Sequence, residues 1–198
     1  MGEHYFTADP AVAFRRSPVR AQVWGHELSL VTGSGVFAQG RVDVGTGVLF
    51  RETEPPTARR YLDLGCGYGV IGLAIAVAVP DAVVRAVDVN ERAVLLAGEN
   101  ARSLGVADRF TASGPDGVPP DECYDELWSN PPIRIGKPAL HELLMRWLPR
   151  LAPEGRAVLV VGRNLGADSL QRWLGEQGYP TERRASAKGF RVLEARAG

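Results

Sequence analysis

Cysteine and histidine are scarce in this sequence, and their scarcity argues against several classes of site. Among 198 residues there are two cysteines, Cys66 and Cys123, and their separation matches no metal-binding spacing. We therefore expect neither a disulfide framework nor a bound metal, and we expect a protein of the reducing cytoplasm. The three histidines, His4, His26 and His141, lack the partner residues that catalysis by histidine requires.

Long apolar runs and an excess of charge are also missing. No run approaches the roughly 18 apolar residues that span a membrane, and the polar first ten residues do not resemble a signal peptide. The chain has 23 Lys+Arg and 23 Asp+Glu, so its overall charge does not indicate a nucleic-acid-binding protein. Basic residues outnumber acidic ones after position 136, however. This local excess could meet a polyanion or could simply be a solvated surface.

Glycine and proline, by contrast, are abundant, with 23 and 14 residues. Near the start of the chain, segments 19–24 and 27–32 are rich in β-forming residues and flank Gly25, which predicts a β-hairpin. Closely spaced glycines over 33–47 predict short strands and turns. A helix is then expected to begin near Val48.

A pair of prolines at positions 55 and 56 marks the boundary between two parts of the chain. We expect residues 1–58 to form a β-rich extension and residues 59–198 to form the main domain, in which strands and helices alternate. The expected strands are 60–64, 82–87, 109–112, 124–129, 157–161, 181–186 and 190–195, and the expected helices are 70–79, 91–104, 137–151 and 168–177. Alternating strands and helices predict an α/β fold with a mostly parallel sheet, and the last two strands predict an antiparallel edge.

The first motif that carries chemistry is DLGCGYG at residues 63–69, between an expected strand and helix. Glycines at such a turn let a ligand approach the backbone closely. Asp88 ends the next expected strand, at about the distance where βαβ nucleotide sites place a ribose-binding acid. The dinucleotide fingerprint requires glycine at its sixth position, which here, counted from Gly65, is Val70. The pattern is instead acid-x-Gly-x-Gly-x-Gly.

This pattern resembles motif I of the class I S-adenosylmethionine-dependent methyltransferases. S-adenosylmethionine has no pyrophosphate, so the phosphate-binding form of the turn is not needed. Its ammonium could be held by Asp63, directly or through water, and its two ribose hydroxyls suit the acceptor oxygens of Asp88. The candidate cofactor-binding residues are Asp63, Gly65, Cys66, Gly67, Tyr68, Gly69, Asp88, Val89, Asn90 and Ser113, of which Cys66 and Tyr68 could contribute only backbone and packing.

A second motif, Asn130-Pro131-Pro132, follows the strand expected at 124–129. Two consecutive prolines end a strand because neither has a backbone N–H. The motif resembles the Asn-Pro-Pro of methyltransferases that act on planar amino groups. Such amines are poor nucleophiles, and the Asn130 side-chain oxygen and the Pro131 carbonyl could accept their hydrogens and aim the nitrogen lone pair at the methyl group. Asn130, Pro131 and Pro132 are therefore the candidate catalytic residues.

Four further residues are candidates for contacting a substrate. Ile133 stands where adenine and glutamine methyltransferases usually carry Tyr or Phe, which argues against those two substrates. Arg134 and Lys137 could meet a phosphate of a target nucleotide, or could be helix-capping and surface charges. Phe37 lies in the glycine-rich segment and could stack on a base, cover the cofactor or belong to the core.

Beyond these motifs, the chain resembles the bacterial methyltransferase small domain family from about residue 4 to 195. The matching blocks are 4–6, 35–37, 42–49, 63–69, 88–93, 129–137 and 188–193. Characterised members are ribosomal RNA guanine-N2 methyltransferases of the small-subunit type. The resemblance implies a Rossmann-like seven-stranded sheet, mostly parallel with an antiparallel edge strand, S-adenosylmethionine as cofactor, and ribosomal RNA or the small ribosomal subunit as partner.

Two departures from that family concern RNA and adenine recognition. The larger members have an additional N-terminal domain that this sequence lacks, and Gly114 follows Ser113 where the family tends to have an Asp that can contact adenine.

The expected function is methylation of guanine N2 in 16S ribosomal RNA. The alternatives are methylation of another planar amine, in a protein amide or a small molecule, and a noncatalytic RNA- or cofactor-binding module. The intact motif residues argue against the last alternative.

Overall fold

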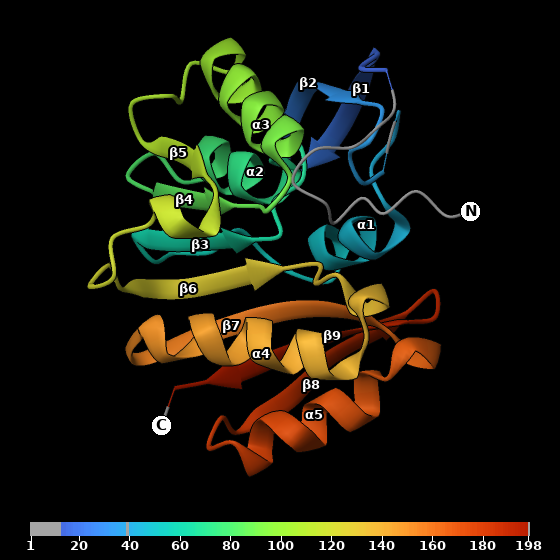
Figure 1. Ribbon diagram of the computed structural model, residues 1–198, viewed down its shortest axis with the longest axis vertical. Coiled ribbons are helices and arrows are strands. Elements are labelled where there is room, and N and C mark those ends of the chain that lie inside the picture. Colours follow the sequence, from blue (N-terminus) through green and yellow to red (C-terminus); the bar gives the residue numbers. More distant parts are fainter. Residues whose placement is uncertain (1–12, 39, 198) are drawn as a thin grey trace.

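The computed structural model describes residues 13–38 and 40–197, and their strands form two sheets (Figure 1). The larger sheet has the strand order β5-β4-β3-β6-β7-β9-β8. Its strands are β3 (Arg60–Leu64), β4 (Val83–Val87), β5 (Phe110–Ser113), β6 (Tyr124–Ser129), β7 (Leu151–Gly162), β8 (Thr181–Ala187) and β9 (Phe190–Arg196). The strands from β5 to β7 in this order are parallel, and β9 runs antiparallel to both β7 and β8. The predicted α/β fold with an antiparallel edge is confirmed.

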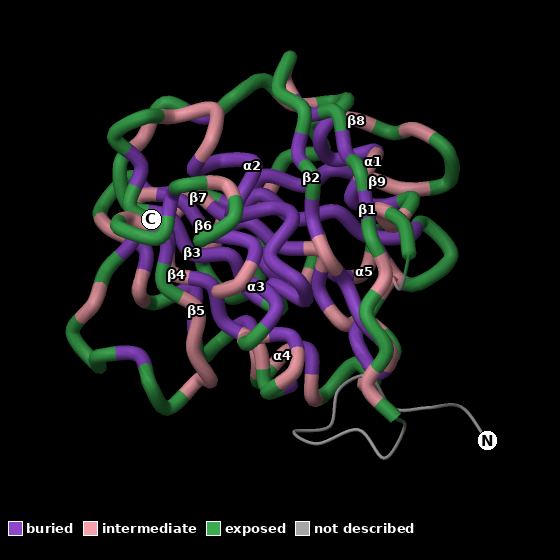
Figure 2. Tube along the Cα trace, turned by 90° about the horizontal axis from the view of Figure 1, so that it is seen from above, coloured by how far each residue is buried: buried purple, intermediate pink, exposed green. Residues whose placement is uncertain are grey.

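Helices cover both faces of the large sheet because alternate strand residues point to opposite faces. In β3, Tyr61 belongs to one core cluster together with Leu96, whereas Leu62 belongs to a second cluster together with Leu140. The helices of the first face are α2 (Val70–Ala78) and α3 (Glu91–Ser103), and those of the second are α4 (Lys137–Trp147) and α5 (Ala167–Glu176). Figure 2 shows the buried segments gathered in the centre of the molecule, between these layers.

The N-terminal hairpin forms as predicted, from β1 (Arg16–Val23) and β2 (His26–Gly33). Its turn consists of Trp24 and Gly25, whose φ angles are 49° and 84°. Two consecutive positive φ values are the signature of the tight turn that matches the twist of a hairpin. The turn therefore fixes the register in which the two strands pair.

The hairpin packs against α2 and α3 and does not extend the large sheet. Asn100 of α3 holds it by accepting a hydrogen bond from Val31 N and donating one to Val31 O. Apolar residues of the hairpin share a core cluster with α2 and α3. We propose that residues 1–58, of which 1–12 and 39 lie outside the described residues, form an extension and that residues 59–198 form the main domain. Among the described residues, one core cluster is common to both.

The prediction of short strands over 33–47 is wrong. Among the residues described there, none forms a strand after β2, and α1 (Val44–Arg51) begins earlier than expected. The cause is the N-cap residue Asp43, whose carboxylate accepts hydrogen bonds from the backbone N–H groups of Gly45 and Thr46. A capped helix start outweighs the low helix propensity of glycine in this segment.

The helix predicted at 137–151 is too long, because α4 ends at Trp147. Pro149 has no backbone N–H and cannot continue an α-helix, so a short 3-10 turn follows instead. The strand predicted at 157–161 is too short, since β7 begins at Leu151 and pairs with β6 across a bulge. The other main-domain elements agree with the structure to within a residue at each end.

In the described part of the chain, no helix has the length and apolar character needed to cross a membrane.

Candidate active site

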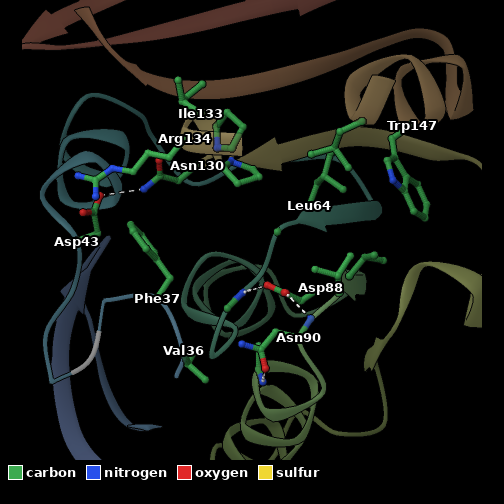
Figure 3. Close-up of a pocket in the computed structure, with 18 of the residues that line it drawn as sticks. Val36, Phe37, Asp43, Leu64, Asp88, Asn90, Asn130, Ile133, Arg134 and Trp147 are labelled. Atoms are coloured by element: carbon green, nitrogen blue, oxygen red, sulfur yellow. Dashed lines mark hydrogen bonds between the residues drawn. The ribbon is translucent and has the colours of Figure 1, made fainter. Parts of the chain in front are cut away.

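A pocket lies at the carboxyl end of the parallel strands, where the order of the sheet reverses. β3 is flanked by β4, the next strand along the chain, and on its other side by β6. Ligands of doubly wound sheets bind at such a switch point. Figure 3 shows the side chains that converge there. The predicted site residues that line the pocket are Phe37, Gly65, Gly67, Asp88, Val89, Asn90, Asn130, Pro131, Pro132, Ile133 and Arg134.

The glycine-rich turn is anchored to the end of β4. The backbone N–H groups of Gly65 and Cys66 both donate to the carbonyl oxygen of Val87, at 2.8 and 3.0 Å. Gly65 and Gly67 have φ angles of 71° and 55°, a left-handed conformation that only glycine adopts readily. A Cβ atom placed at Gly67 would meet nothing within 4 Å. The turn thus presents open backbone to the pocket.

Asp88 binds the same turn through its carboxylate. Oδ2 accepts a hydrogen bond from Gly67 N and Oδ1 accepts one from Asn90 N, each at 2.9 Å (Figure 3). Burial raises the pKa of Asp88, and these backbone hydrogen bonds oppose the rise. Each carboxylate oxygen can accept a further hydrogen bond. The side chain is therefore oriented with acceptor capacity to spare, which suits a ligand with paired hydroxyls.

Asp63 lies beneath the pocket and does not line it. It is fully buried; its Oδ2 accepts a hydrogen bond from Gly72 N at 2.8 Å, and its Oδ1 has no hydrogen-bond partner among the described residues. Burial raises the pKa of Asp63 to about 7, with a smaller contribution from the Asp88 carboxylate. A buried acceptor without a partner is unfavourable unless a ligand or a water satisfies it.

We expect the stability of the protein to fall with rising pH because of Asp63. Its pKa is about 7 in the folded state and about 3.9 when exposed. Between these values the folded state binds more protons, so rising pH favours unfolding. Asp63→Asn should flatten this dependence and reduce the loss in Tm between pH 5 and 8 by about 3 °C or more. The exposed Asp81→Asn variant serves as control. Parallel Tm curves for wild type and Asp63→Asn would show that the buried carboxyl does not titrate in this range.

The end of β6 is held by three hydrogen bonds to distant parts of the chain, one from Ser129 and two from Asn130. The preceding residue, Ser129, donates from Oγ to the carbonyl oxygen of Leu64 at 2.6 Å. Asn130 Nδ2 donates to Asp43 Oδ2 at 2.9 Å and to Thr46 Oγ1 at 3.1 Å (Figure 3). For its Oδ1 oxygen, no hydrogen bond is found within the described part of the chain. This oxygen is available as an acceptor.

The two prolines form a tight turn that fixes the chain after Asn130. Pro132 has φ −74° and ψ 68°, the conformation at the centre of an inverse γ-turn. Accordingly, Ile133 N donates to the carbonyl oxygen of Pro131 at 2.8 Å. One of the two lone pairs of that carbonyl is therefore already used, and one remains for a ligand.

Three predicted cofactor residues of the glycine-rich turn are placed behind the pocket wall. Cys66 and Tyr68 are buried in the core, and the Tyr68 hydroxyl donates to the carbonyl oxygen of Arg41 at 3.2 Å. A Cβ atom at Gly69 would lie 3.0 Å from the Cβ atom of Ala97. In this structure, Cys66 and Tyr68 contribute backbone and packing, and Gly69 allows α2 and α3 to approach.

Ser113 and Lys137, also predicted, lie beside the pocket without lining it. The Ser113 Oγ is buried and has no hydrogen-bond partner among the described residues, so it is free for a ligand that reaches it. The nearby Asp116 is exposed and forms an ion pair with Arg146 at 2.9 Å. Asp116 does not line the pocket.

Other pocket residues were not predicted. Some adjoin a predicted residue and others come from elements remote in sequence; they are Val36, Leu64, Val87, Ala93, Pro115, Leu143, Trp147, Gly162, Leu165 and Phe190. Asp43, in the block 42–49 that carries the family resemblance, also lines the pocket. Trp147 is buried and its Nε1 has no hydrogen-bond partner among the described residues. Val36, Ala93 and Phe190 fall within blocks that carry the family resemblance, and Asp43 is also marked by the helix-capping pattern that follows it.

Exposed cations lie close in sequence to residues that line the pocket. The loop at Arg163 is tied to the β8–β9 turn by a hydrogen bond from Arg163 N to Gly189 O at 2.8 Å, and the neighbouring Leu165 and Phe190 line the pocket. Five of these basic residues are exposed, namely Arg41, Arg134, Lys137, Arg163 and Lys188. Within residues 13–38 and 40–197, no ion pair is found for any of them. They form what we call the rim cations.

A family model for the methyltransferase small domain matches residues 27–194, which include both motifs and all of the large sheet except the last two residues of β9. The chain belongs to the methyltransferase small domain family. Among relatives, a Bacillus subtilis protein named "Uncharacterized protein YbxB" is 30% identical over 99% of both chains. The Pseudomonas aeruginosa "Ribosomal RNA small subunit methyltransferase C" is 33% identical over 86% of this chain and 51% of its own length. The chain thus spans about half the length of this second relative.

A solved member of similar structure is the T. thermophilus 16S rRNA N2 methyltransferase, determined in complex with AdoMet and guanosine. The TM-score is 0.81 at 24% sequence identity, and the match covers 96% of this chain and 53% of that chain. This similarity establishes a shared fold.

Proposed function

We propose that this chain is an S-adenosylmethionine-dependent methyltransferase that methylates the exocyclic N2 amine of a guanine in small-subunit ribosomal RNA. The observation that carries the proposal is the free Oδ1 of Asn130, which lies in the same pocket as Asp88 and the glycine-rich turn. An amine that is methylated needs an acceptor for its hydrogens beside the methyl donor. The names of the relatives support ribosomal RNA as the substrate class.

Three observations fit the pocket to S-adenosylmethionine. At Gly65 the nearest atom to an added Cβ is Pro132 Cδ at 3.8 Å, and at Gly67 there is none within 4 Å, so the backbone is open to a ligand. Asp88 retains lone pairs for two ribose hydroxyls. Asp63 Oδ1 is buried without a partner and would hold the ammonium through water. When bound, the cofactor supplies a methyl group on a positively charged sulfur.

Asn130 and Pro131 would orient the amine of the substrate. The N2 lone pair of guanine is delocalised into the ring, so the amine is a weak nucleophile. Asn130 Oδ1 and the remaining lone pair of the Pro131 carbonyl would accept its two hydrogens and favour the tetrahedral geometry in which the lone pair is localised. The methylated amine is cationic and strongly acidic, so it loses its proton without a general base.

The aromatic side chains at the pocket mouth would contact the base. Phe37 is 41% exposed and lines the pocket with Phe190, and Figure 3 places Phe37 between Val36 and Asn130. Aromatic rings stack on splayed-out bases in many RNA-binding sites. Ile133 follows the prolines and would offer an apolar contact in place of the aromatic ring found in adenine and glutamine enzymes.

The rim cations Arg134 and Lys137 would hold the RNA backbone. We expect the Arg134→Gln, Lys137→Gln double variant to weaken RNA binding several-fold. The slope of log affinity against log salt should fall by about 0.7 for each lost phosphate contact. Affinity for S-adenosylmethionine should not change. The control is Arg102→Gln, an exposed arginine at the end of α3 remote from its pocket-facing start. An unchanged salt slope, measured by filter binding, would exclude these two residues from the RNA contact.

The function is tested by a methyl-transfer assay with labelled S-adenosylmethionine on a panel of acceptors from an unmethylated source. The panel contains 30S subunits, 16S RNA, 50S subunits and total protein. We expect label in the 30S or 16S sample. Label only in protein would support the amide alternative, and cofactor binding without label anywhere would support a binding module.

A further inference from the structure

The side-chain amide of Asn130 is held by two acceptors from a distant part of the chain. Its Nδ2 lies 2.9 Å from Asp43 Oδ2 and 3.1 Å from Thr46 Oγ1, across sequence separations of 87 and 84 residues. A carboxylate can only accept hydrogen bonds. The nitrogen of the amide must therefore face Asp43, and the oxygen must face the other way.

These two acceptors are themselves fixed on the first turn of α1. Asp43 Oδ2 also accepts from Gly45 N at 2.7 Å as the helix N-cap, and Thr46 is only 3% exposed. A Cβ atom at Gly45 would lie 2.8 Å from the Phe190 ring, so the helix start packs closely against β9. The acceptors are thus held by cap geometry and by packing.

We propose that Asp43 and Thr46 are positioning residues that present Oδ1, and not Nδ2, of Asn130 to the substrate amine. A rotation of the amide by half a turn would turn Oδ1 toward the Asp43 carboxylate, which cannot donate a hydrogen bond, and would place an N–H donor against the N–H donors of the amine. This inference rests on the proposed function for its consequence in catalysis. It goes further by giving the first turn of α1, outside both recognised motifs, a role in the reaction.

Thr46→Val is the cleanest test because valine keeps the shape of threonine and removes only the hydroxyl that bonds Asn130 Nδ2. We expect kcat to fall by about 3- to 10-fold, the effect of one neutral hydrogen bond, with an unchanged KM for S-adenosylmethionine. Thr46→Ser should restore most of the rate. Thr53→Val is the matched control, since it removes a hydroxyl from the other end of α1, where it bonds Leu49 O.

A double-mutant cycle separates positioning from a general structural effect. In an Asn130→Ala background, Thr46→Val should have no further effect on kcat, because the amide that it positions is gone. An equal loss in both backgrounds, or an unchanged kcat in Thr46→Val, would overturn the proposal.

A spectroscopic measurement keeps this proposal separate from the proposed function. In protein with ¹⁵N-labelled asparagine, the side-chain amide signal of Asn130 is assigned by its absence in Asn130→Ala. We expect slow exchange of its hydrogens in the wild type and faster exchange in Thr46→Val. If the exchange behaves so but the wild type transfers no methyl group, the proposed function fails and the positioning stands. Fast exchange in the wild type would overturn the positioning.

Discussion

Asn130→Ala is expected to reduce kcat by about 10²–10³-fold, the usual effect of removing one preorganised group that stabilises a transition state. Asn130 Oδ1 is the acceptor that the structure leaves free in the pocket, while its Nδ2 is engaged by Asp43 and Thr46. The interaction strengthens as the amine becomes tetrahedral, so the loss should be in kcat and not in KM. Single-turnover rates with saturating cofactor measure it directly.

The affinity of the Asn130→Ala variant for S-adenosylmethionine distinguishes a catalytic from a structural role. Asn130 shares the pocket with the glycine-rich turn but forms none of the hydrogen bonds that anchor that turn. We expect calorimetry to give nearly the wild-type Kd. A loss of cofactor affinity as large as the loss of rate would mean that Asn130 only supports the pocket.

The second large effect is expected from Asp88→Ala, which should weaken binding of S-adenosylmethionine by about 10- to 100-fold. A hydrogen bond to a charged group contributes about 1.5–3 kcal/mol, so the loss of even one of the two that the ribose could donate to the carboxylate accounts for this effect. The carboxylate also anchors Gly67 N and Asn90 N, so its removal loosens the turn. At saturating cofactor most of the rate should remain, because Asp88 does not contact the reacting amine.

Asp88→Asn provides the matched comparison for this effect. Asparagine keeps one acceptor oxygen and the size of the side chain, so its Kd should lie between those of wild type and Asp88→Ala. Calorimetry with S-adenosylmethionine gives all three values. An unchanged Kd in Asp88→Ala would remove Asp88 from the cofactor site.

The fold could be predicted where strong local signals coincide. The bounds of β3 and β6 follow from short apolar runs that end in glycine or in Asn-Pro-Pro, and the start of α3 follows from the N-cap Asn90. Residues 44–51 show the limit of this approach. Their glycines indicated turns, but the carboxylate of Asp43 caps a helix there. Propensity is a weak guide where helix capping and tertiary packing oppose it.

The site was predictable mainly in the parts that the two contiguous motifs and the end of β4 supply. Asp88 and Asn130 reach the pocket because parallel strands end at a common edge, a rule that needs no structure. The contact between Asp43 and Asn130 spans 87 residues and leaves no local pattern. Trp147 reaches the pocket from the inner face of α4, where a buried aromatic is indistinguishable in sequence from an ordinary core residue.

The nucleoside that receives the methyl group tests the central claim most directly. The purified chain is incubated with labelled S-adenosylmethionine and unmethylated 30S subunits or 16S RNA, and the RNA is digested to nucleosides for mass spectrometry. The account predicts label in N2-methylguanosine, and loss of that label in Asn130→Ala. Label in a ring-nitrogen or ribose methylation product would contradict the amine-orienting role assigned to Asn130.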